Sequence, residues 1–361
     1  MTTQAVDTEF LIKEKNQRAA AWFWVLHGAA WLALIAYCWT MWVVSGDFKT
    51  NTIGRGGEPM WFVILVRCVE VGFGIIFTGW IVWHFIIQPK IKTGSFSFNG
   101  LFFMACLLLA FQEPWINWTT LQFLYSTTFV NFGSWLPQIP GWSSPNGQLI
   151  PMPLVYVAAY LWMLGMAAYG GSRYMAYLRR KNPAVGAARL IGQTFALMVV
   201  IDIVVELIMT RTQLISYGST IPWLTLFAGT DHQFPIYEPL HWPGTFILLS
   251  CLHFFRDDRG RSLPERHIDR LPIRSGKLKT VARFAALAGA CQLTILFAFN
   301  IPYQLWALHS GPMPQVFIDR EWRTAGVCGP KTAYDCPNPK LPIARESSPT
   351  NRIVQVPHPG R

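Results

Sequence analysis

The chain has 361 residues, of which 52% are hydrophobic, 15% aromatic and only 14% charged. Soluble domains carry about 25% charged residues, and the stretch from Pro114 to Ser172 contains no Asp, Glu, Lys, Arg or His. This composition excludes a soluble globular enzyme, a disordered chain and a disulfide scaffold. The net charge of +11 does not indicate nucleic-acid binding, because the basic residues lie in connectors between apolar segments, as membrane topology requires.

Seven apolar segments approach or exceed the length of about 20 residues that a helix needs to cross the hydrocarbon core. The sequence therefore predicts an all-α, polytopic transmembrane bundle of about seven spans. The sixth predicted span is the shortest, and the segment Ile221–Gly229 before it has the character of a re-entrant or interfacial piece. In chain order the predicted spans are Ala20–Val44, Trp61–Ile87, Phe98–Trp118, Leu154–Leu178, Leu190–Leu214, Pro239–Phe255 and Val281–Leu308.

The distribution of basic residues predicts an orientation. Lys and Arg gather before span one, between spans two and three, after span four and between spans six and seven, whereas the alternate connectors hold few or none. The positive-inside rule then places the N-terminus inside and the C-terminus outside. The predicted organisation is a cytoplasmic tail over 1–19, a bundle over 20–310 with an uncharged outer loop over 119–152, and a polar outer tail over 311–361.

The cysteines agree with this orientation. Five of the seven lie in apolar spans, where cysteine behaves as a small buried hydrophobic residue. Cys328 and Cys336 lie in the predicted outer tail, where oxidising conditions allow disulfides to persist. We therefore predict a disulfide between them.

Several ionisable residues fall within the spans, where charge is costly and usually functional. Arg67 and Glu70 lie one turn apart in span two, either as a structural ion pair or as part of a site. In span three Glu113 precedes Pro114, whose missing amide predicts a kink. The orientation puts the ionisable groups of spans two, three, five and six in the outer half, so we expect one shared polar cavity there.

Asp202 and Glu206 share a face of span five, since they are four residues apart. Two carboxylates cannot pair with each other, so they need a cation, a shared proton or water. Glu238 and His241 open span six, either at a solvated interface or at the site. His232, Glu238 and His241 lie near one another in sequence, but no His-x-x-x-His spacing is present, so we predict no metal and no cofactor.

The outer connector over 131–147 combines turn-forming residues with large aromatic residues. It is too apolar for an ordinary exposed loop and too interrupted for a helix. It is either an aromatic interfacial belt or a lid over the outer cavity.

Several short sequence motifs between residues 111 and 147 resemble the AveC-like spirocyclase family. The resemblance extends over roughly 20–310, is sharpest across 111–147, and is carried by Phe111-Gln-Glu-Pro114, Asn117, Val130-Asn-Phe-Gly-Ser-Trp135, Ile139-Pro-Gly-Trp142 and Ser144-Pro-Asn-Gly147. Members are bacterial integral membrane proteins known from spiroketal formation in avermectin-type polyketide pathways, and they tend to carry Asp at the position of Glu113. The resemblance implies a multi-pass protein of the bacterial cytoplasmic membrane.

The function implied by the resemblance is a cofactor-independent cyclase or dehydratase that closes a lipophilic hydroxyketone with loss of water. The partners expected are this small molecule and membrane lipid. The candidate catalytic residues are Glu113, Asp202 and Glu206. The candidate substrate-binding residues are Arg67, Glu70, Asn117, Asn131, Trp135, Trp142, Arg211, Glu238 and His241. The alternatives are a seven-span terpene or epoxide cyclase, a proton-coupled transporter of a lipophilic compound, and a subunit that only scaffolds or hands on substrate.

Overall fold

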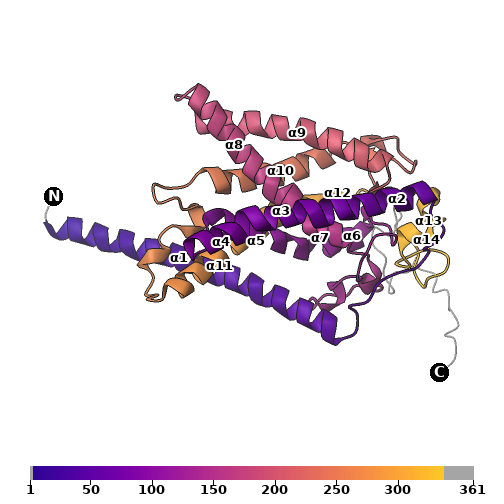
Figure 1. Cartoon of the computed structure of the whole chain (residues 1–361), viewed down its shortest axis with the longest axis horizontal. Helices are drawn as coiled ribbons and strands as arrows, with labels where there is room; N and C mark the ends of the chain where they lie inside the picture. Colours follow the sequence, from indigo (N-terminus) through magenta and orange to yellow (C-terminus); the bar gives the residue numbers. More distant parts are fainter. Residues whose placement is uncertain (1–2, 337–361) are drawn as a thin grey trace.

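The computed structural model describes residues 3–336 and is mostly helical. The helices lie side by side along one long axis, with the N-terminus at one end of the molecule and the last described residues at the other (Figure 1). In chain order the principal helices are α1 (Thr3–Val44), α2 (Met60–Val69), α3 (Thr78–Ile81), α4 (Gln88–Thr93), α5 (Phe98–Leu107), α6 (Glu113–Thr120), α7 (Leu154–Ala159), α8 (Met166–Lys181), α9 (Ala187–Arg211), α10 (Glu238–Phe254), α11 (Gly276–Ile295), α12 (Ile301–Ala307), α13 (Gln315–Ile318) and α14 (Glu321–Thr324).

Short π-helical or 3-10 turns join several of these helices into longer rods, so the described chain contains six helical stretches long and apolar enough to cross a membrane. They are Glu14–Val44, Met60–Thr93, Phe98–Thr119, Leu154–Lys181, Ala187–Arg211 and Gly276–Ala307. These six coincide with predicted spans. The predicted span Pro239–Phe255 coincides with α10, which has 17 residues. The prediction of a mostly helical chain with apolar helices of membrane-spanning length is confirmed.

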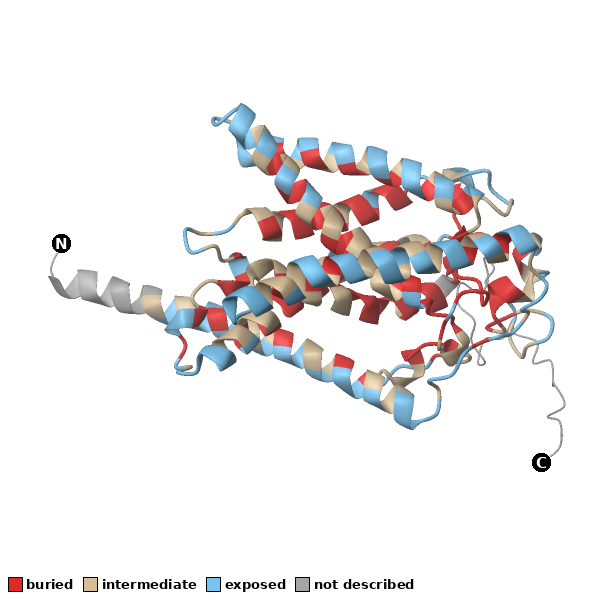
Figure 2. Cartoon of the chain, in the orientation of Figure 1, coloured by how far each residue is buried: buried red, intermediate tan, exposed pale blue. Residues whose placement is uncertain are grey.

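Large apolar side chains cover the outside of the bundle. Ile75 is 68% exposed, Val200 60% and Phe297 62%. Figure 2 shows exposed residues along the outward faces of α2, α3 and α9, with buried residues behind them. An apolar surface of this extent is typical of contact with lipid rather than with water.

The long first helix approaches α11 closely because two glycines face each other. A Cβ atom at Gly28 would lie 1.7 Å from the carbonyl oxygen of Ala285, and one at Gly289 would lie 2.8 Å from the Cα of Gly28. Small residues at such crossings allow the backbones of membrane helices to pack tightly. α1 begins at Thr3, so the helix extends into the predicted tail over 1–19.

Two connectors and the segment after α12 form a cap at the end of the bundle opposite the N-terminus (Figure 1). The uncharged connector contributes β1 (Phe123–Leu124), which pairs antiparallel with β2 (Ser216–Tyr217) from the connector after α9. The segment after β2 carries β3 (Thr225–Leu226), which pairs with β4 (Phe234–Pro235). Most of the connector over 121–136 is buried, and α13 and α14 pack in the same cap.

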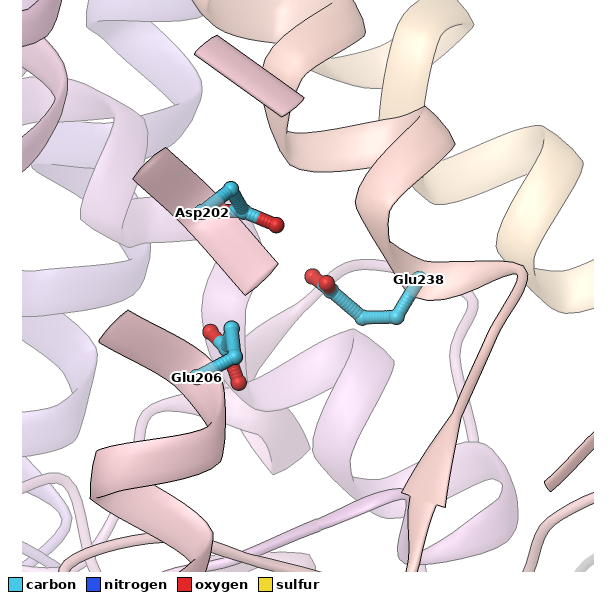
Figure 3. A group of neighbouring side chains, drawn as sticks. All are labelled: Asp202, Glu206 and Glu238. Carbon is cyan, nitrogen blue, oxygen red and sulfur yellow. The ribbon is translucent and has the colours of Figure 1, made fainter. Parts of the chain in front are cut away.

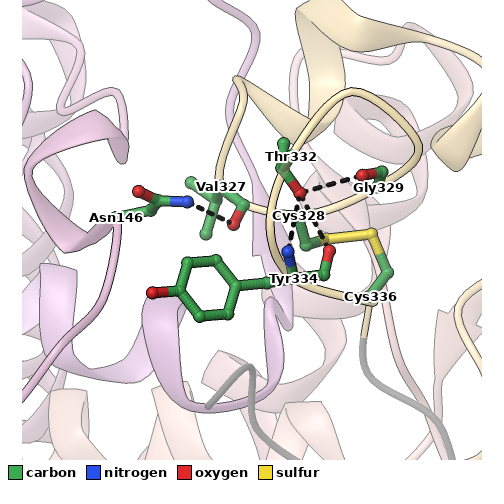
Figure 4. The surroundings of a disulfide bond; sticks show 7 residues. All are labelled: Asn146, Val327, Cys328, Gly329, Thr332, Tyr334 and Cys336. Atoms are coloured by element: carbon green, nitrogen blue, oxygen red, sulfur yellow. Dashed lines mark hydrogen bonds between the residues drawn. A yellow bond between two sulfur atoms is a disulfide. The ribbon is translucent and has the colours of Figure 1, made fainter. Parts of the chain in front are cut away.

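The segment over 311–336 is less solvent-exposed than its polar composition predicts. Phe317, Trp322 and Arg323 are all buried. Cys328 and Cys336 form the predicted disulfide, which is thereby confirmed, and Asn146 of the uncharged connector donates a hydrogen bond to the Val327 carbonyl beside it at 3.3 Å (Figure 4). The remainder of the predicted tail, 337–361, lies outside the described residues.

We expect Cys328 and Cys336 to resist alkylation in intact, unreduced cells and to react after reduction. The reason is that a disulfide persists only in an oxidising compartment. The measurement is mass-shift labelling with a thiol-reactive polymer before and after treatment with reductant. Labelling of both cysteines without reductant would contradict the disulfide.

Candidate functional site

The first buried acidic centre is built around Glu113, at the start of α6. The helix tightens into a 3-10 turn over Leu108–Gln112, and Pro114 then occupies the first turn of α6. Proline suits this position because its missing N–H would lack an intrahelical partner there anyway. The sequence predicted a kink at this point, and the structure shows a tighter turn that presents Glu113 to the interior.

Three side-chain donors hold the Glu113 carboxyl, which is only 2% exposed. Its Oε1 accepts hydrogen bonds from the Tyr125 hydroxyl at 2.6 Å and from Asn117 Nδ2 at 3.4 Å. Its Oε2 accepts one from the Tyr160 hydroxyl. Among the described residues no Lys or Arg forms an ion pair with Glu113. A carboxyl group held by neutral donors in a buried place can give up or take a proton without breaking an ion pair.

The second acidic centre joins two helices. Asp202 and Glu206 lie one turn apart on α9, and Glu238 is the first residue of α10. One carboxylate oxygen of each lies within 4.8 Å of the others, and all three side chains are buried. Figure 3 shows the three carboxyl groups pointing toward one another. α10 packs against α9, which brings together residues that are 32 positions or more apart in the sequence.

The polar partners of this second centre are few. The Tyr217 hydroxyl, on β2, donates a hydrogen bond to Glu206 Oε2 at 2.7 Å. Neither oxygen of Glu238 has a donor among the described residues, and neither does Asp202 Oδ2. No described Lys or Arg forms an ion pair with the cluster. Three ionised carboxylates at this spacing would repel one another strongly, so the cluster needs protons or a cation.

An aromatic layer borders both centres. The Tyr125 and Tyr156 rings stack at 4.4 Å between centroids, and the Tyr156 hydroxyl donates a hydrogen bond to the Leu214 carbonyl at 3.0 Å. Phe123 packs against Tyr217 at 4.9 Å, across the β1–β2 pair. Through Tyr125 and Tyr217 this aromatic layer contacts both Glu113 and Glu206, which share no direct hydrogen bond in the described chain.

Arg67 and Glu70 form an ion pair with each other, as one of the two interpretations predicted. Their remaining hydrogen bonds go to the backbone of the uncharged connector: Arg67 Nη2 donates to the Thr128 carbonyl at 2.6 Å, and the Val130 amide donates to Glu70 Oε1 at 2.6 Å. These contacts anchor the cap. In the described chain neither side chain forms a hydrogen bond with the two acidic centres.

Other predicted binding residues also organise the cap. Asn131 is buried and donates to the Phe129 carbonyl at 2.9 Å. Trp135 is buried and donates to the Phe111 carbonyl at 2.9 Å, just before Glu113 in the chain. Trp142 is partly exposed and packs against two other tryptophans.

Arg211 and His241 differ in their relation to the acidic centres. Arg211 is exposed, with its guanidinium 4.4 Å from the centroid of the Phe227 ring. His241 lies one turn after Glu238 and is buried. Its Nδ1 is 3.3 Å from the Ala298 carbonyl, and its Nε2 has no partner among the described residues.

Sequence reasoning missed the tyrosines that complete both centres and a buried arginine beside the first. A small cavity borders Asn117 and Tyr125, and Arg323 of α14 lines its other side. Burial lowers the pKa of Arg323 to about 9, which leaves the guanidinium charged at neutral pH. Its backbone acceptors are the carbonyls of Leu124 and Gln213. Arg323 lies in the predicted outer tail, and no periodicity connects it to Glu113.

A comparison with protein-family models matches most of the bundle. The family model described as spirocyclase AveC-like matches residues 95–322. The matched range includes Glu113, Asp202, Glu206 and Glu238, with the tyrosines that contact them. No curated protein and no solved structure matches the chain.

Proposed function

The chain belongs to the AveC-like spirocyclase family, and from this premise we propose that it is a membrane-embedded cyclase that closes a lipophilic hydroxyketone with loss of water. The observation that carries this proposal is the Glu113 centre, a buried carboxyl group held by two phenols and an amide within the matched range. This arrangement suits proton transfer and needs no redox cofactor.

In the proposed reaction Glu113 in its protonated form donates a proton to the hydroxyl group of a cyclic hemiketal. The C–O bond breaks, water leaves and an oxocarbenium ion remains. A second hydroxyl of the substrate attacks the cationic carbon and loses its proton to a carboxylate, which completes the spiroketal. In glycoside hydrolysis, one carboxyl group of a pair likewise acts as the general acid and the other as base or nucleophile, around an oxocarbenium-like transition state.

The surroundings of Glu113 support both states of its carboxyl group. Tyr125 and Tyr160 donate to its oxygens, which stabilises the carboxylate after proton transfer. Aromatic rings line this part of the interior and limit the access of water, which would otherwise add to the oxocarbenium ion. We propose Asp202 and Glu206 as the second acidic centre of the same reaction, with Glu238 beside them, and the cap as the cover over the outer end.

We propose seven spans in the bacterial cytoplasmic membrane, with the N-terminus inside. The support is the alternation of Lys and Arg between connectors. In Figure 1 the connectors that follow α8 and α10 lie at the same end as the N-terminus, and the disulfide segment lies at the other. This proposal requires the 17-residue α10 to cross as well.

A reporter enzyme that works only outside the cytoplasm tests the topology. Fused after Trp306, it is expected to be active, and fused near Gly260, in the basic connector, it is expected to be inactive. The reason is that Lys and Arg are retained on the cytoplasmic side. Equal activity at the two sites would overturn the seven-span arrangement.

The proposed activity is tested with the purified full chain in lipid vesicles. A long-chain dihydroxyketone is added, and extracts are analysed by mass spectrometry for a product lighter by one water. Faster formation than in protein-free vesicles supports the cyclase. Accumulation of unchanged hydroxyketone inside vesicles only under a proton gradient, without product, would instead support the transporter.

A further inference from the structure

No basic side chain in the described chain forms an ion pair with the carboxyl groups of the second acidic centre. Asp202, Glu206 and Glu238 contribute three carboxyl groups, all buried, with an oxygen of each within 4.8 Å of the others. In the described chain the Tyr217 hydroxyl donates a hydrogen bond to Glu206, and Asp202 and Glu238 lie close enough to share a proton with each other. Glu238 is 0% exposed, and neither of its oxygens has a donor outside the cluster in the part of the chain that is described. Buried carboxylates are normally paired or bound to a metal ion.

A second observation points to an occupant at the same place. The Tyr303 side chain, on α12, is 0% exposed, and its hydroxyl has no hydrogen-bond partner among residues 3–336. The Tyr303 ring packs against the His241 ring, one turn after Glu238, with 5.4 Å between centroids. It also stacks on Phe123, which packs against the Tyr217 ring that bonds Glu206, so the phenol belongs to the surroundings of the cluster. A buried hydroxyl group without a partner is costly. A ligand between the carboxyl groups and this phenol would satisfy both sides.

We propose that Asp202, Glu206 and Glu238 bind a hard divalent cation of the Mg²⁺, Mn²⁺ or Ca²⁺ class, with the Tyr303 hydroxyl at the edge of the site. Such cations take oxygen ligands at about 2.0–2.6 Å, so two ligands of one ion lie at most about 4–5 Å apart. The carboxylate oxygens already satisfy this limit. Carboxylate and hydroxyl oxygens select hard cations over softer metals.

This site goes beyond the proposed function, because the binding of a cation does not depend on the substrate. One divalent cation among three carboxylates leaves a net charge of −1 at the centre. With the ion bound, Asp202 and Glu206 serve as ligands, and Glu113 remains the proton donor of the reaction. The cation would then offer an open position to a substrate oxygen.

The test uses the purified full chain in detergent with Mn²⁺ as the probe. The EPR signal of free Mn²⁺ measures the fraction bound during a titration. We expect one Mn²⁺ bound per chain, displaced by excess Mg²⁺ or Ca²⁺. Glu238→Gln and, separately, Asp202→Asn are expected to weaken binding at least tenfold. Glu14→Gln is the matched control, because it removes one carboxylate from an exposed pair with Arg18 and is expected to bind like the wild type.

The wild-type titration needs no variant, so a variant that fails to fold does not remove the test. Absence of Mn²⁺ binding up to about 1 mM, the weak end of protein Ca²⁺ sites, would overturn the proposal, as would unchanged binding in both Glu238→Gln and Asp202→Asn. If the protein binds no cation but still cyclises a hydroxyketone, the cation site is refuted and the proposed function stands. If the protein binds Mn²⁺ but does not cyclise a hydroxyketone, the cation site stands and the proposed function is refuted.

Discussion

Replacing Glu113 by glutamine is expected to lower the turnover of a hydroxyketone by about 10²- to 10⁴-fold, the usual cost of losing a general acid or base. The amide keeps the size of the side chain, and its oxygen can accept a hydrogen bond from one of the two tyrosines while its NH2 group donates to the hydroxyl of the other. It cannot transfer a proton to the leaving hydroxyl. The measurement is the rate of product formation per mole of protein in vesicles.

The same variant is expected to insert and remain monodisperse, because glutamine fits the neutral, hydrogen-bonded surroundings of Glu113. Glu58→Gln is a suitable control, since Glu58 bonds to Thr128 in the cap and contacts neither acidic centre in the described chain. Tyr160→Phe removes one donor from Glu113 and is expected to have a smaller effect than the amide. Wild-type turnover in Glu113→Gln would refute its role as proton donor.

Asp202→Asn is expected to reduce turnover by at least about 10²-fold, because the second centre loses either a group that moves a proton or a ligand of the cation that would meet the substrate oxygen. Asparagine retains the volume of the side chain but removes one of the three carboxyl groups at the second centre. Glu206→Gln is expected to act in the same direction, since the two residues share a face of α9. The measurement is again product formation by matched amounts of folded protein.

Asp269→Asn provides the comparison for this second prediction. Asp269 pairs with Arg261 in the basic connector, far along the chain from α9, and its substitution is expected to leave turnover unchanged. If Asp202→Asn and Glu206→Gln both turn over at the wild-type rate, the second centre takes no part in the reaction.

The helices of this chain were predictable because lipid imposes a simple rule. A segment in the hydrocarbon region must satisfy its backbone internally and expose apolar side chains, so long apolar runs become helices. All seven predicted segments are helical, and six of them are long and apolar enough to cross a membrane. The disulfide between Cys328 and Cys336 was predictable for a similar reason, because only two cysteines lie outside the apolar runs.

The composition of the acidic centres was only partly predictable. The sequence places Asp202 and Glu206 on one face because their spacing matches one turn of helix. The predicted orientation puts Glu238 at a similar depth, but its contact with the pair depends on how α10 packs against α9, which the sequence does not specify. The expectation that no metal binds rested on histidine spacing, which says nothing about a site made of carboxylates from two helices.

The partners of Glu113 illustrate the same limit. Tyr125 lies in a connector without periodicity, and Tyr160 lies in a π-helical stretch over Tyr160–Gly165, where the register differs from an ordinary helix. Arg323 reaches the bundle from a segment that its polar composition assigned to the outer tail. Long-range contacts of this kind arise from the folding of the cap, which local sequence patterns do not encode.

The stereochemistry of the product tests most directly whether ring closure occurs inside this protein. Acid in solution closes a dihydroxyketone from either face and yields a mixture of spiroketal configurations. Closure between the Glu113 centre and the aromatic layer is expected to yield one configuration, measured by chiral chromatography of extracts from vesicles that contain the full chain. The same mixture, formed at the same rate as in protein-free vesicles, would contradict the assignment of this chain as a cyclase.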